Sequence, residues 1–478
     1  MRNLVQSLCL SKYPLSAVIP RYTRQARMRP CAAWLMLLGF FVATHGCTSL
    51  STRPVNMART VLHIAPRADS VGSEQFSRTM DRVTNSQETA GNRVQLLTNG
   101  AEAFPAMLAA IDNARKCVSI EFYKIRTDAV GELFSQALIR AAKRGVKVRF
   151  LYDAYGSRTV TYSDFTALVD AGVEVCVFNP IMWFTFLRAN NRDHRKILVV
   201  DGRVAFLGGV NLGEEYDGDG LNGWRDTAIM IEGPAALDAE RVFNASWLQG
   251  GFGPFGKDLP IVGIYPLKRT MDAPLVRLFN LAGTACVPDA PLPVAGQAIV
   301  RIVASDPHYL SSTIVDKYLL AINSARTSID ITSAYFLPPL ILRRALVDAA
   351  KRGVRLRLIV QGSSDVPVTH TGTIGHYGTL LKHGAEIYEW DKSVLHAKTM
   401  VVDGVWSTIG SANLDGRALF LSYEVNAAVL DRALAEAVKE QFERDLTYCH
   451  RVTREEWKRR PLTQKVMEII LSPFAGQF

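Results

Sequence analysis

The stretch LHAKTMVVDG, residues 395–404, places a histidine and a lysine two positions apart and ends in an Asp-Gly pair. The apolar residues TMVV are largely β-branched, so we predict a strand here. Side chains alternate between the two faces of a strand, and His396 and Lys398 therefore share one face. Asp403 lies on the other face and begins a dipeptide that is typical of hairpin turns. We predict that His396 and Lys398 act together and that Asp403 secures the turn.

The same arrangement occurs earlier in the chain, in DHRKILVVDGRVAFLGGVNL at residues 193–212. Four positions match in the two copies: His194, Lys196, Asp201 and Asn211 in the first, and His396, Lys398, Asp403 and Asn413 in the second. A single histidine on a strand is usually a packed or surface residue. Histidine is scarce in this chain, with 9 in 478 residues, so two matching copies are difficult to attribute to chance.

The duplication extends beyond these motifs. AAKRGVKVRFLYD at 141–153 parallels AAKRGVRLRLIVQG at 349–362, and each indicates the end of a helix, a Gly stop and a strand. A further strand precedes each copy, at 117–125 and at 328–336. Strands that alternate with helices favour an α/β fold in each half. We expect the halves to pack about a pseudo-twofold axis, with both His-Lys pairs in one cleft.

The chain is long enough for two globular lobes, and its composition suggests six regions. They are a membrane-targeting segment (1–47), a flexible segment (48–92), a first repeat (93–250), a Gly- and Pro-rich linker (251–300), a second repeat (301–450) and a basic, apolar tail (451–478). The net charge of +10 suggests anionic partners, either phospholipid surfaces or nucleic acid. Nothing in the sequence indicates the oligomeric state.

The sequences near the two ends of the chain favour association with a membrane. Arginines precede the apolar run CAAWLMLLGFFVA at 31–43, which is shorter than the ~20 residues of a spanning helix but suits a secretory signal. Gly46 and Cys47 follow and resemble a bacterial lipoprotein cleavage site, with Cys47 as the lipidated residue. An ordinary signal peptide or an uncleaved anchor is the alternative. We expect a membrane-associated protein that faces the periplasm, and its tail suits an interfacial helix or packs on the second repeat.

The other cysteines carry less information. Cys117 and Cys176 lie in predicted strands and are expected to be buried thiols, whereas Cys286 and Cys449 lie in less regular stretches. No Cys-x-x-Cys pair or His-rich spacing occurs, so we expect neither a metal site nor a redox role.

Two His-Lys pairs suit the cleavage of a phosphodiester without metal. The lysines supply positive charge, the asparagines donate hydrogen bonds, one neutral histidine attacks phosphorus and the other, protonated, serves the leaving alcohol. Each histidine needs an acceptor for its second ring nitrogen. The candidates are Asp226 in GWRDT and Glu424 in LSYEVN, although each of these also suits a surface carboxylate at a strand edge.

These motifs resemble the phospholipase D superfamily, and the chain from about 94 to 474 is similar to bacterial cardiolipin synthases. Segments that carry the resemblance include GWRDT, SAYFLPP, LLKHGAEIYEW and EEWKRRPL. The resemblance implies two pseudo-symmetric phospholipase D-like α/β sandwich repeats packed around one shared active-site cleft. It also implies phosphatidyl transfer through phosphohistidine, no metal or other cofactor, and phospholipid substrates such as phosphatidylglycerol, with no nucleic acid.

The resemblance assigns roles to eight residues. The catalytic histidines are His194, as nucleophile, and His396, as acid; the phosphate-binding residues are Lys196, Lys398, Asn211 and Asn413; the histidine-orienting carboxylates are Asp226 and Glu424. Ala418 and Ser422 stand where the family commonly has Ser and Asn, which leaves the acceptor alcohol open. A hydrolytic phospholipase D, in which water attacks second, is the nearest alternative. A nuclease of the same superfamily and a lipid-binding scaffold are more distant ones.

Overall fold

A computed structural model of the chain describes residues 70–180, 190–250, 286, 288, 292–307, 313–362, 364–365 and 367–471. The targeting segment predicted at 1–47, with Cys47, and most of the linker predicted at 251–300 lie outside these residues. The elements up to residue 250 are α3 (Glu74–Thr84), β1 (Thr89–Thr98), α4 (Asn99–Asp112), β2 (Cys117–Phe122), α5 (Ala129–Lys143), β3 (Lys147–Asp153), η1 (Tyr162–Phe165), α6 (Thr166–Asp170), β4 (Glu174–Phe178), β5 (Lys196–Val200), β6 (Val204–Gly208), η3 (Glu214–Tyr216), β7 (Thr227–Glu232) and α7 (Ala235–Gly250).

The second repeat and the tail follow the same order of elements and then add to it. They comprise β8 (Ala298–Ala304), α10 (Thr313–Ser324), β9 (Ser328–Ser333), β10 (Phe336–Leu337), α11 (Leu340–Lys351), β11 (Arg355–Gln361), α12 (Pro367–Lys382), β12 (Glu386–Trp390), β13 (Lys398–Val402), β14 (Trp406–Gly410), β15 (Leu414–Asp415), α13 (Gly416–Phe420), β16 (Val425–Leu430), α14 (Arg432–Leu446), β17 (Cys449–Val452), α15 (Arg454–Arg459) and α16 (Leu462–Leu471).

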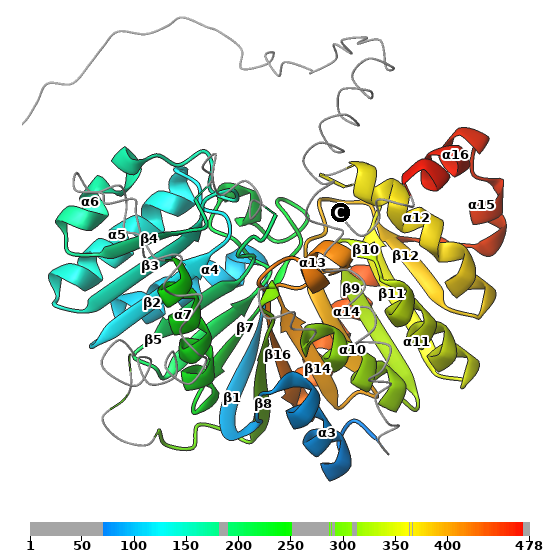
Figure 1. The fold of residues 1–478 in the computed structure, drawn as a ribbon, viewed down its shortest axis with the longest axis horizontal. Coiled ribbons are helices and arrows are strands. Elements are labelled where there is room, and N and C mark those ends of the chain that lie inside the picture. Colours follow the sequence, from blue (N-terminus) through cyan, green and yellow to red (C-terminus); the bar gives the residue numbers. More distant parts are fainter. Residues whose placement is uncertain are drawn as a thin grey trace, which may run out of the picture. The chain divides into compact units, whose positions relative to one another are not determined.

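Strands of both repeats form one large sheet (Figure 1), and β10 and β15 pair in a separate two-stranded sheet. From the central antiparallel pair β1–β8, the first repeat runs β1-β7-β6-β5-β2-β3-β4 and the second runs β8-β16-β14-β13-β9-β11-β12. Each strand that the first repeat gives to this sheet therefore has a counterpart at the same place in the second repeat, and β17 adds one strand at the edge of the second. This confirms the predicted duplication and the α/β fold class. The halves also share a continuous sheet, which the sequence did not predict.

Helices cover both faces of each half-sheet. In the first repeat α4, α5 and α6 form one core with β2, β3 and β5, and in the second α10, α11 and α12 form its counterpart with β9, β11 and β13. A third core contains α7, α14 and residues of both half-sheets. Within it β6 and β7 contact β14 and β16, although these strands are far apart in the sheet order. The repeats therefore pack against each other through a shared core.

Each predicted hairpin forms, and its Asp-Gly pair occupies the turn. Asp201 and Gly202 have φ of 53° and 62°, and Asp403 and Gly404 have φ of 53° and 65°, as a type I′ turn requires. The Asp201 carboxylate accepts backbone N–H groups that lead into β2, at 2.7–3.0 Å. Asp403 does the same before β9, at 2.8–3.2 Å. Each aspartate thus joins its hairpin to the neighbouring strand.

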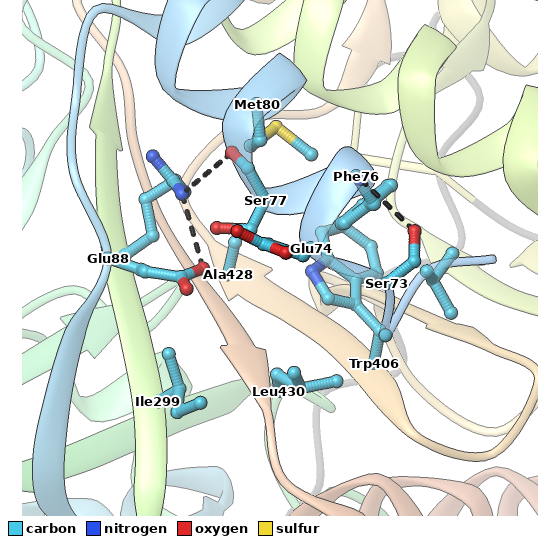
Figure 2. Close-up of a pocket in the computed structure, with 13 residues that line it drawn as sticks. Ser73, Glu74, Phe76, Ser77, Met80, Glu88, Ile299, Trp406, Ala428 and Leu430 are labelled. Carbon is cyan, nitrogen blue, oxygen red and sulfur yellow. Dashed lines mark hydrogen bonds and ion pairs between the residues drawn. The ribbon is translucent and has the colours of Figure 1, made fainter. Parts of the chain in front are cut away.

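The prediction of a flexible segment at 48–92 is wrong for its second part. Helix α3 begins after Ser73, whose hydroxyl accepts the N–H of Phe76 at 3.1 Å. Phe76 and Met80 are buried in the core of the second repeat. Arg301 of β8 pairs with Asp81 of the helix at 2.6 Å. A cavity of about 280 Å³ remains between α3 and the sheet (Figure 2). This segment is held in place by apolar contacts with residues far away in the sequence, and local composition does not reveal such contacts.

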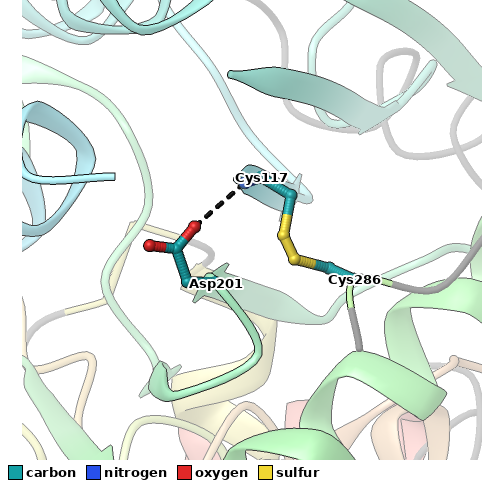
Figure 3. Close-up of side chains that lie close together, drawn as sticks. All are labelled: Cys117, Asp201 and Cys286. Atoms are coloured by element: carbon teal, nitrogen blue, oxygen red, sulfur yellow. Dashed lines mark hydrogen bonds between the residues drawn. A yellow bond between two sulfur atoms is a disulfide. The ribbon is translucent and has the colours of Figure 1, made fainter. Parts of the chain in front are cut away.

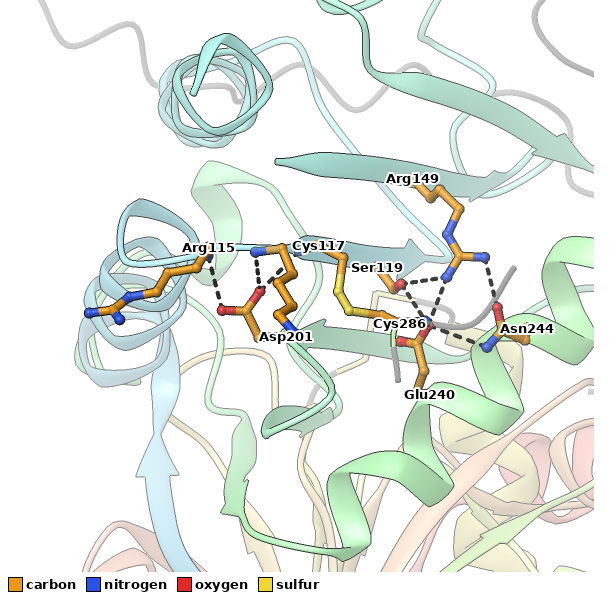
Figure 4. The surroundings of a disulfide bond; sticks show 9 residues. Arg115, Cys117, Ser119, Arg149, Asp201, Glu240, Asn244 and Cys286 are labelled. Carbon is orange, nitrogen blue, oxygen red and sulfur yellow. Dashed lines mark hydrogen bonds and ion pairs between the residues drawn. A yellow bond between two sulfur atoms is a disulfide. The ribbon is translucent and has the colours of Figure 1, made fainter. Parts of the chain in front are cut away.

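The prediction that Cys117 is a free thiol is also wrong. Cys117 and Cys286 form a disulfide, with Cα atoms 6.0 Å apart (Figure 3), whereas Cys176 is a buried thiol as predicted. The half-cystines are 169 residues apart, so no local spacing marks them as a pair. Beside the bridge, Glu240 of α7 accepts from Arg149 at 2.7 Å and from the backbone N–H of Cys286 at 3.3 Å (Figure 4). The disulfide therefore joins Cys286 to the start of β2.

The tail packs on the second repeat. Strand β17 pairs antiparallel with β12, and α15 and α16 lie beside α12 at the same end of the molecule (Figure 1). The indole N–H of Trp457 donates to the carbonyl of Ile374 in α12 at 2.9 Å. Among the helices of the described ranges, none is long and apolar enough to cross a bilayer.

Candidate active site

The two histidines sit at equivalent places, each two residues before a hairpin strand that begins with its lysine. Each is fixed by the opposite repeat through its backbone. The N–H of His194 donates to the carbonyl of Tyr423 at 2.9 Å, and the N–H of His396 donates to the carbonyl of Arg225 at 2.7 Å. Short parallel bridges at these points join the two repeats. The structure thus brings both motifs to the junction between the halves.

Each imidazole is held by a carboxylate of the opposite repeat. Nδ1 of His194 lies 2.9 Å and 3.1 Å from the two carboxylate oxygens of Glu424. Nδ1 of His396 lies 2.6 Å from Oδ2 of Asp226. A carboxylate accepts, so Nδ1 carries the proton in each ring and Nε2 is left for chemistry. Both carboxylates are buried, at 1% and 0% exposure, which removes the surface interpretation for Asp226 and Glu424.

The two lysines turn back onto their histidines. Nζ of Lys196 donates to the carbonyl of His194 at 2.6 Å, and Nζ of Lys398 donates to the carbonyl of His396. Burial lowers the pKa of Lys196 to about 7 and that of Lys398 to about 8, and the charge of Lys398 lowers the pKa of Lys196 further by repulsion. Glu424 and Asp226 act in the opposite direction on both. The two cations therefore share one electrostatic environment.

The pKa values of the histidines and of their carboxylate partners are shifted as well. Burial first, and then the charges of Lys196 and Lys398, lower the pKa of His194 and of His396 well below the ordinary value. Burial raises the pKa of Asp226 to about 6, against the attraction of Lys398, and raises that of Glu424 well above its usual range. These shifts favour the neutral form of both imidazoles near pH 7, beside two lysines.

The two asparagines differ in their contacts. Asn211 donates to the Tyr216 hydroxyl at 2.7 Å and accepts the backbone N–H of Lys124 at 3.1 Å. Asn413 is buried, and its Oδ1 has no hydrogen-bond partner. Ala418 occupies the position that matches Tyr216 in the repeat, so the second copy lacks that hydroxyl. The repeats are therefore not equivalent around the asparagines, although their motifs match.

Aromatic side chains next to the imidazoles were not predicted from the sequence. The Tyr123 ring meets His194 edge-on at 4.8 Å, and the rings of Tyr216 and Trp224 each lie 5.4 Å from that of His396. Trp224 stands in the segment GWRDT that carried the resemblance, and that was the only signal. These rings pack against the imidazoles and contribute to their burial.

Contacts that hold the carboxylates in place were missed too. Ser411 donates its hydroxyl to Glu424. At the matching position Gly209 leaves room for Asp226, whose Oδ1 would lie 2.2 Å from an added Cβ. Next to Asp226, Arg225 forms a buried ion pair with Asp445 of α14 at 2.7 Å, which joins the repeats again. The Gly-Gly and Gly-Ser pairs of the motif were the available signal for the first two contacts.

Metal-binding geometry is found at one place among the residues that the structure describes. The ligand atoms of Cys117, Asp201 and Cys286 lie within 4.8 Å of one another. The two sulfurs are joined in a disulfide there (Figure 3), and Asp201 already accepts three backbone N–H groups. This group has a structural role, because it joins the turn of the first hairpin to the start of β2.

A duplicated α/β fold whose halves exchange histidine–carboxylate contacts across one junction defines a phospholipase D-like protein. The chain belongs to the family described as cardiolipin synthase, PLD-like domain, whose model matches residues 107–247 and 318–446. It is 31% identical over 462 residues to a cardiolipin synthase of Clostridium perfringens, covering 92% of each chain. It is 33% identical over 398 residues to one of Geobacillus sp., covering 82% of this chain and 74% of that one.

A solved structure agrees on the fold. The crystal structure of a phosphatidylserine synthase from Haemophilus influenzae matches 84% of this chain and 97% of its own, with a TM-score of 0.61 and 14% identity. At that identity the likeness concerns the arrangement of helices and strands alone. It supports the two-repeat α/β architecture for the described residues.

Proposed function

We propose that the protein is a phosphatidyltransferase that makes cardiolipin: it moves a phosphatidyl group from one phosphatidylglycerol to the hydroxyl of another and releases glycerol. The observation that carries the proposal is the crossed pair of contacts, His194 with Glu424 and His396 with Asp226, beside two buried lysines. Relatives named cardiolipin synthase, similar over most of the chain, support the choice of substrate class.

In the first step, Nε2 of His194 attacks the phosphorus of the donor lipid. The bond from phosphorus to the glycerol oxygen breaks, and that oxygen takes the proton from Nε2 of His396. The product is phosphatidyl-His194 with free glycerol. His194 is assigned as nucleophile because its side chain is the more accessible of the two, at 15% exposure against 6% for His396.

In the second step, His396 acts as a general base instead of a general acid. Its neutral Nε2 takes the proton from the hydroxyl of a second phosphatidylglycerol, whose oxygen attacks the phosphorus. The P–N bond breaks and returns its electron pair to His194, which leaves cardiolipin. Lys196, Lys398, Asn211 and Asn413 bind the phosphate oxygens, and the lysines neutralise the charge that develops on them.

His396 must be protonated for the first step, although burial and the lysines lower its pKa. A bound phosphodiester places its negative charge beside the same lysines and so removes part of that repulsion. The pKa of His396 therefore rises when substrate arrives, and Asp226 stabilises the imidazolium that results. Substrate binding and the supply of the acid are thereby linked.

A hydrolytic phospholipase D is the second candidate, because it differs only in whether water or an alcohol attacks the intermediate. The aromatic rings around the histidines favour transfer, since they restrict water near the phosphorus. Ala418 and Ser422 replace the Ser and Asn that are common in the family, and the identity of the acceptor alcohol is therefore proposed here.

We further propose that the enzyme is exported and acts on a bacterial membrane from the periplasmic side. The signal-like segment at 1–47 and its Gly46-Cys47 pair are the basis, with lipidation at Cys47 as the mode of attachment. The Cys117–Cys286 disulfide supports an oxidising compartment, because such bonds are rare in reducing cytosol.

Incubation of the full-length protein with phosphatidylglycerol vesicles, followed by mass spectrometry of the lipids, tests the proposal. Cardiolipin with an equal amount of glycerol is the expected result. Phosphatidic acid with glycerol would identify a hydrolase instead. Release of nucleotides from DNA without any lipid turnover would overturn the substrate class.

A further inference from the structure

Helix α16 exposes a row of large apolar side chains that no described part of the chain covers. Leu462, Val466 and Ile470 are 75%, 46% and 48% exposed. They are spaced four residues apart, so they lie on one face of the helix, one above the other. Soluble proteins seldom leave such a row in water without a use, because each exposed side chain forgoes the free energy of burial.

The opposite side of this helix is firmly attached. Arg460 forms two hydrogen bonds to Glu468, both at 2.7 Å, and its guanidinium lies 3.9 Å from the Trp457 ring centroid. Trp457 in turn rests on α12, where an added Cβ at Gly378 would lie 2.2 Å from the indole. The two partners of the ion pair are only 14% and 10% exposed. These contacts attach α16 to α15 and α12 through the side of the helix opposite the apolar row, so the row faces outward.

The charge around the row selects one kind of partner. Lys458 and Arg459 are exposed at the end of α15, and Lys465 immediately precedes Val466. From 451 to 471 basic residues outnumber acidic ones, and the whole chain carries a net charge of +10. An apolar row flanked by cations fits the boundary between headgroups and acyl chains of an anionic bilayer.

Helix α12, to which α15 and α16 are attached, also begins near the candidate active site. Helix α12, on which Trp457 of α15 packs, begins two residues after Asp365, and the Asp365 carboxylate accepts the Tyr335 hydroxyl at 2.8 Å. Asp365 is near enough for its charge to act on Lys398. Helix α12 therefore contacts α16 and begins close to a residue that acts on the second histidine motif.

We propose that Leu462, Val466 and Ile470 form a docking surface for an anionic phospholipid bilayer, separate from attachment through residues 1–47. The inference rests on the proposed function, because a lipid-transferring enzyme must take its substrates from such a surface. The docked helix holds the second repeat at the bilayer, where phosphatidylglycerol enters.

Hydrogen–deuterium exchange of the full-length protein tests the docking directly. Phosphatidylglycerol vesicles should slow exchange in peptides that cover 462–471, and phosphatidylcholine vesicles should slow it much less. Unchanged exchange, or equal protection by the neutral vesicles, would overturn the proposal. Protection that appears on concentrating the protein without lipid would overturn it too, because it would assign the row to a second copy of the chain.

Activity separates docking from catalysis. The double variant Leu462→Gln, Val466→Gln should lose activity several-fold on phosphatidylglycerol vesicles and keep it on a short-chain, water-soluble phosphatidylglycerol. The control Leu133→Gln, Val294→Gln removes two apolar side chains of similar exposure, 55% and 75%, and should match the native protein in both assays. Equal loss in both assays would contradict the docking role. If the native protein turns over neither substrate, the proposed function fails, while the exchange experiment still decides the docking.

Discussion

The carboxylate of Glu424, from the second repeat, lies 2.9 Å from Nδ1 of His194, from the first. Asp226 of the first repeat serves His396 of the second in the same way, at 2.6 Å. Neither repeat therefore contains a complete histidine–carboxylate pair. The duplicated chain makes two such pairs only when its halves are packed together, which couples assembly of the site to assembly of the fold.

Replacing Asp226 by Asn should slow turnover by about 10²–10⁴-fold with little change in stability. The Asn oxygen can still accept the Thr227 N–H, which Oδ1 does at 2.7 Å, but its NH₂ group would face Nδ1 of His396 and favour the wrong tautomer. Neutralising a carboxylate whose pKa burial raises also removes a desolvation cost. Steady-state kinetics and thermal unfolding measure the two effects. A lowered Tm with unchanged kcat would contradict the orienting role.

His194→Ala and His396→Ala should each abolish transfer, because one removes the nucleophile and the other the proton donor. Denaturing mass spectrometry after brief exposure to phosphatidylglycerol distinguishes their roles. A phosphatidyl adduct should form on the peptide that contains His194 in the native protein and be absent from His194→Ala. An adduct on the His396 peptide would reverse the assignment of nucleophile and acid.

The dependence of kcat/KM on pH should be bell-shaped. Phosphate binding needs protonated lysines, so the rate should fall as pH rises through about 7–8, where Lys196 and Lys398 lose their protons. On the acid side it should fall below about 6, as Asp226 gains a proton and no longer stabilises the imidazolium. kcat/KM reports the free enzyme, in which the pKa of His396 is lowered as well, so loss of the proton of the general acid adds to the fall as pH rises. A rate that stays constant up to pH 10 would show that the lysines retain their ordinary protonation.

Asp403→Asn should mainly lower stability, by about 1–3 kcal/mol. The Asp403 carboxylate accepts the backbone N–H groups of Arg326, Thr327 and Ser328, and an amide offers one acceptor oxygen and no charge. Thermal unfolding should show the loss, whereas kcat of the folded fraction should stay near the native value. Asp226→Asn is the matched comparison, with the opposite pattern expected. A large fall in kcat for Asp403→Asn would place this residue in the chemistry.

Reduction of the Cys117–Cys286 disulfide should destabilise the first repeat by about 2–4 kcal/mol, because the bond closes a long loop. Non-reducing peptide mapping of the exported protein should recover the two cysteines in one linked peptide pair. Dithiothreitol should lower Tm of the native protein but leave the variant Cys117→Ser, Cys286→Ser unchanged. Recovery of both cysteines as free thiols would contradict the bridge and weaken the case for an oxidising compartment.

Much of the fold could be read from local patterns. The duplicated hairpins appear where the apolar β-branched runs and Asp-Gly pairs predicted them, at β5–β6 and β13–β14. The Gly stops after α5 and α11 are confirmed, since Gly145 and Gly353 both have φ of 86°. Strand β2 ends at Phe122 and β9 at Ser333, three residues before the predicted ends. These features depend on residues near one another in the chain, which is why they were predictable.

The sequence by itself determined the duplication, the α/β class and the identity of the eight polar residues gathered at the junction, because periodicity, turn chemistry and repeated spacing are properties of neighbouring residues. Only the tertiary structure decided that Glu424 serves His194 and Asp226 serves His396, that Cys286 returns to Cys117, and that α3 joins the second core. Each of these contacts joins segments far apart in the chain. Their partners are set by how the half-sheets and their helices pack in three dimensions, and no local stretch of sequence records that packing.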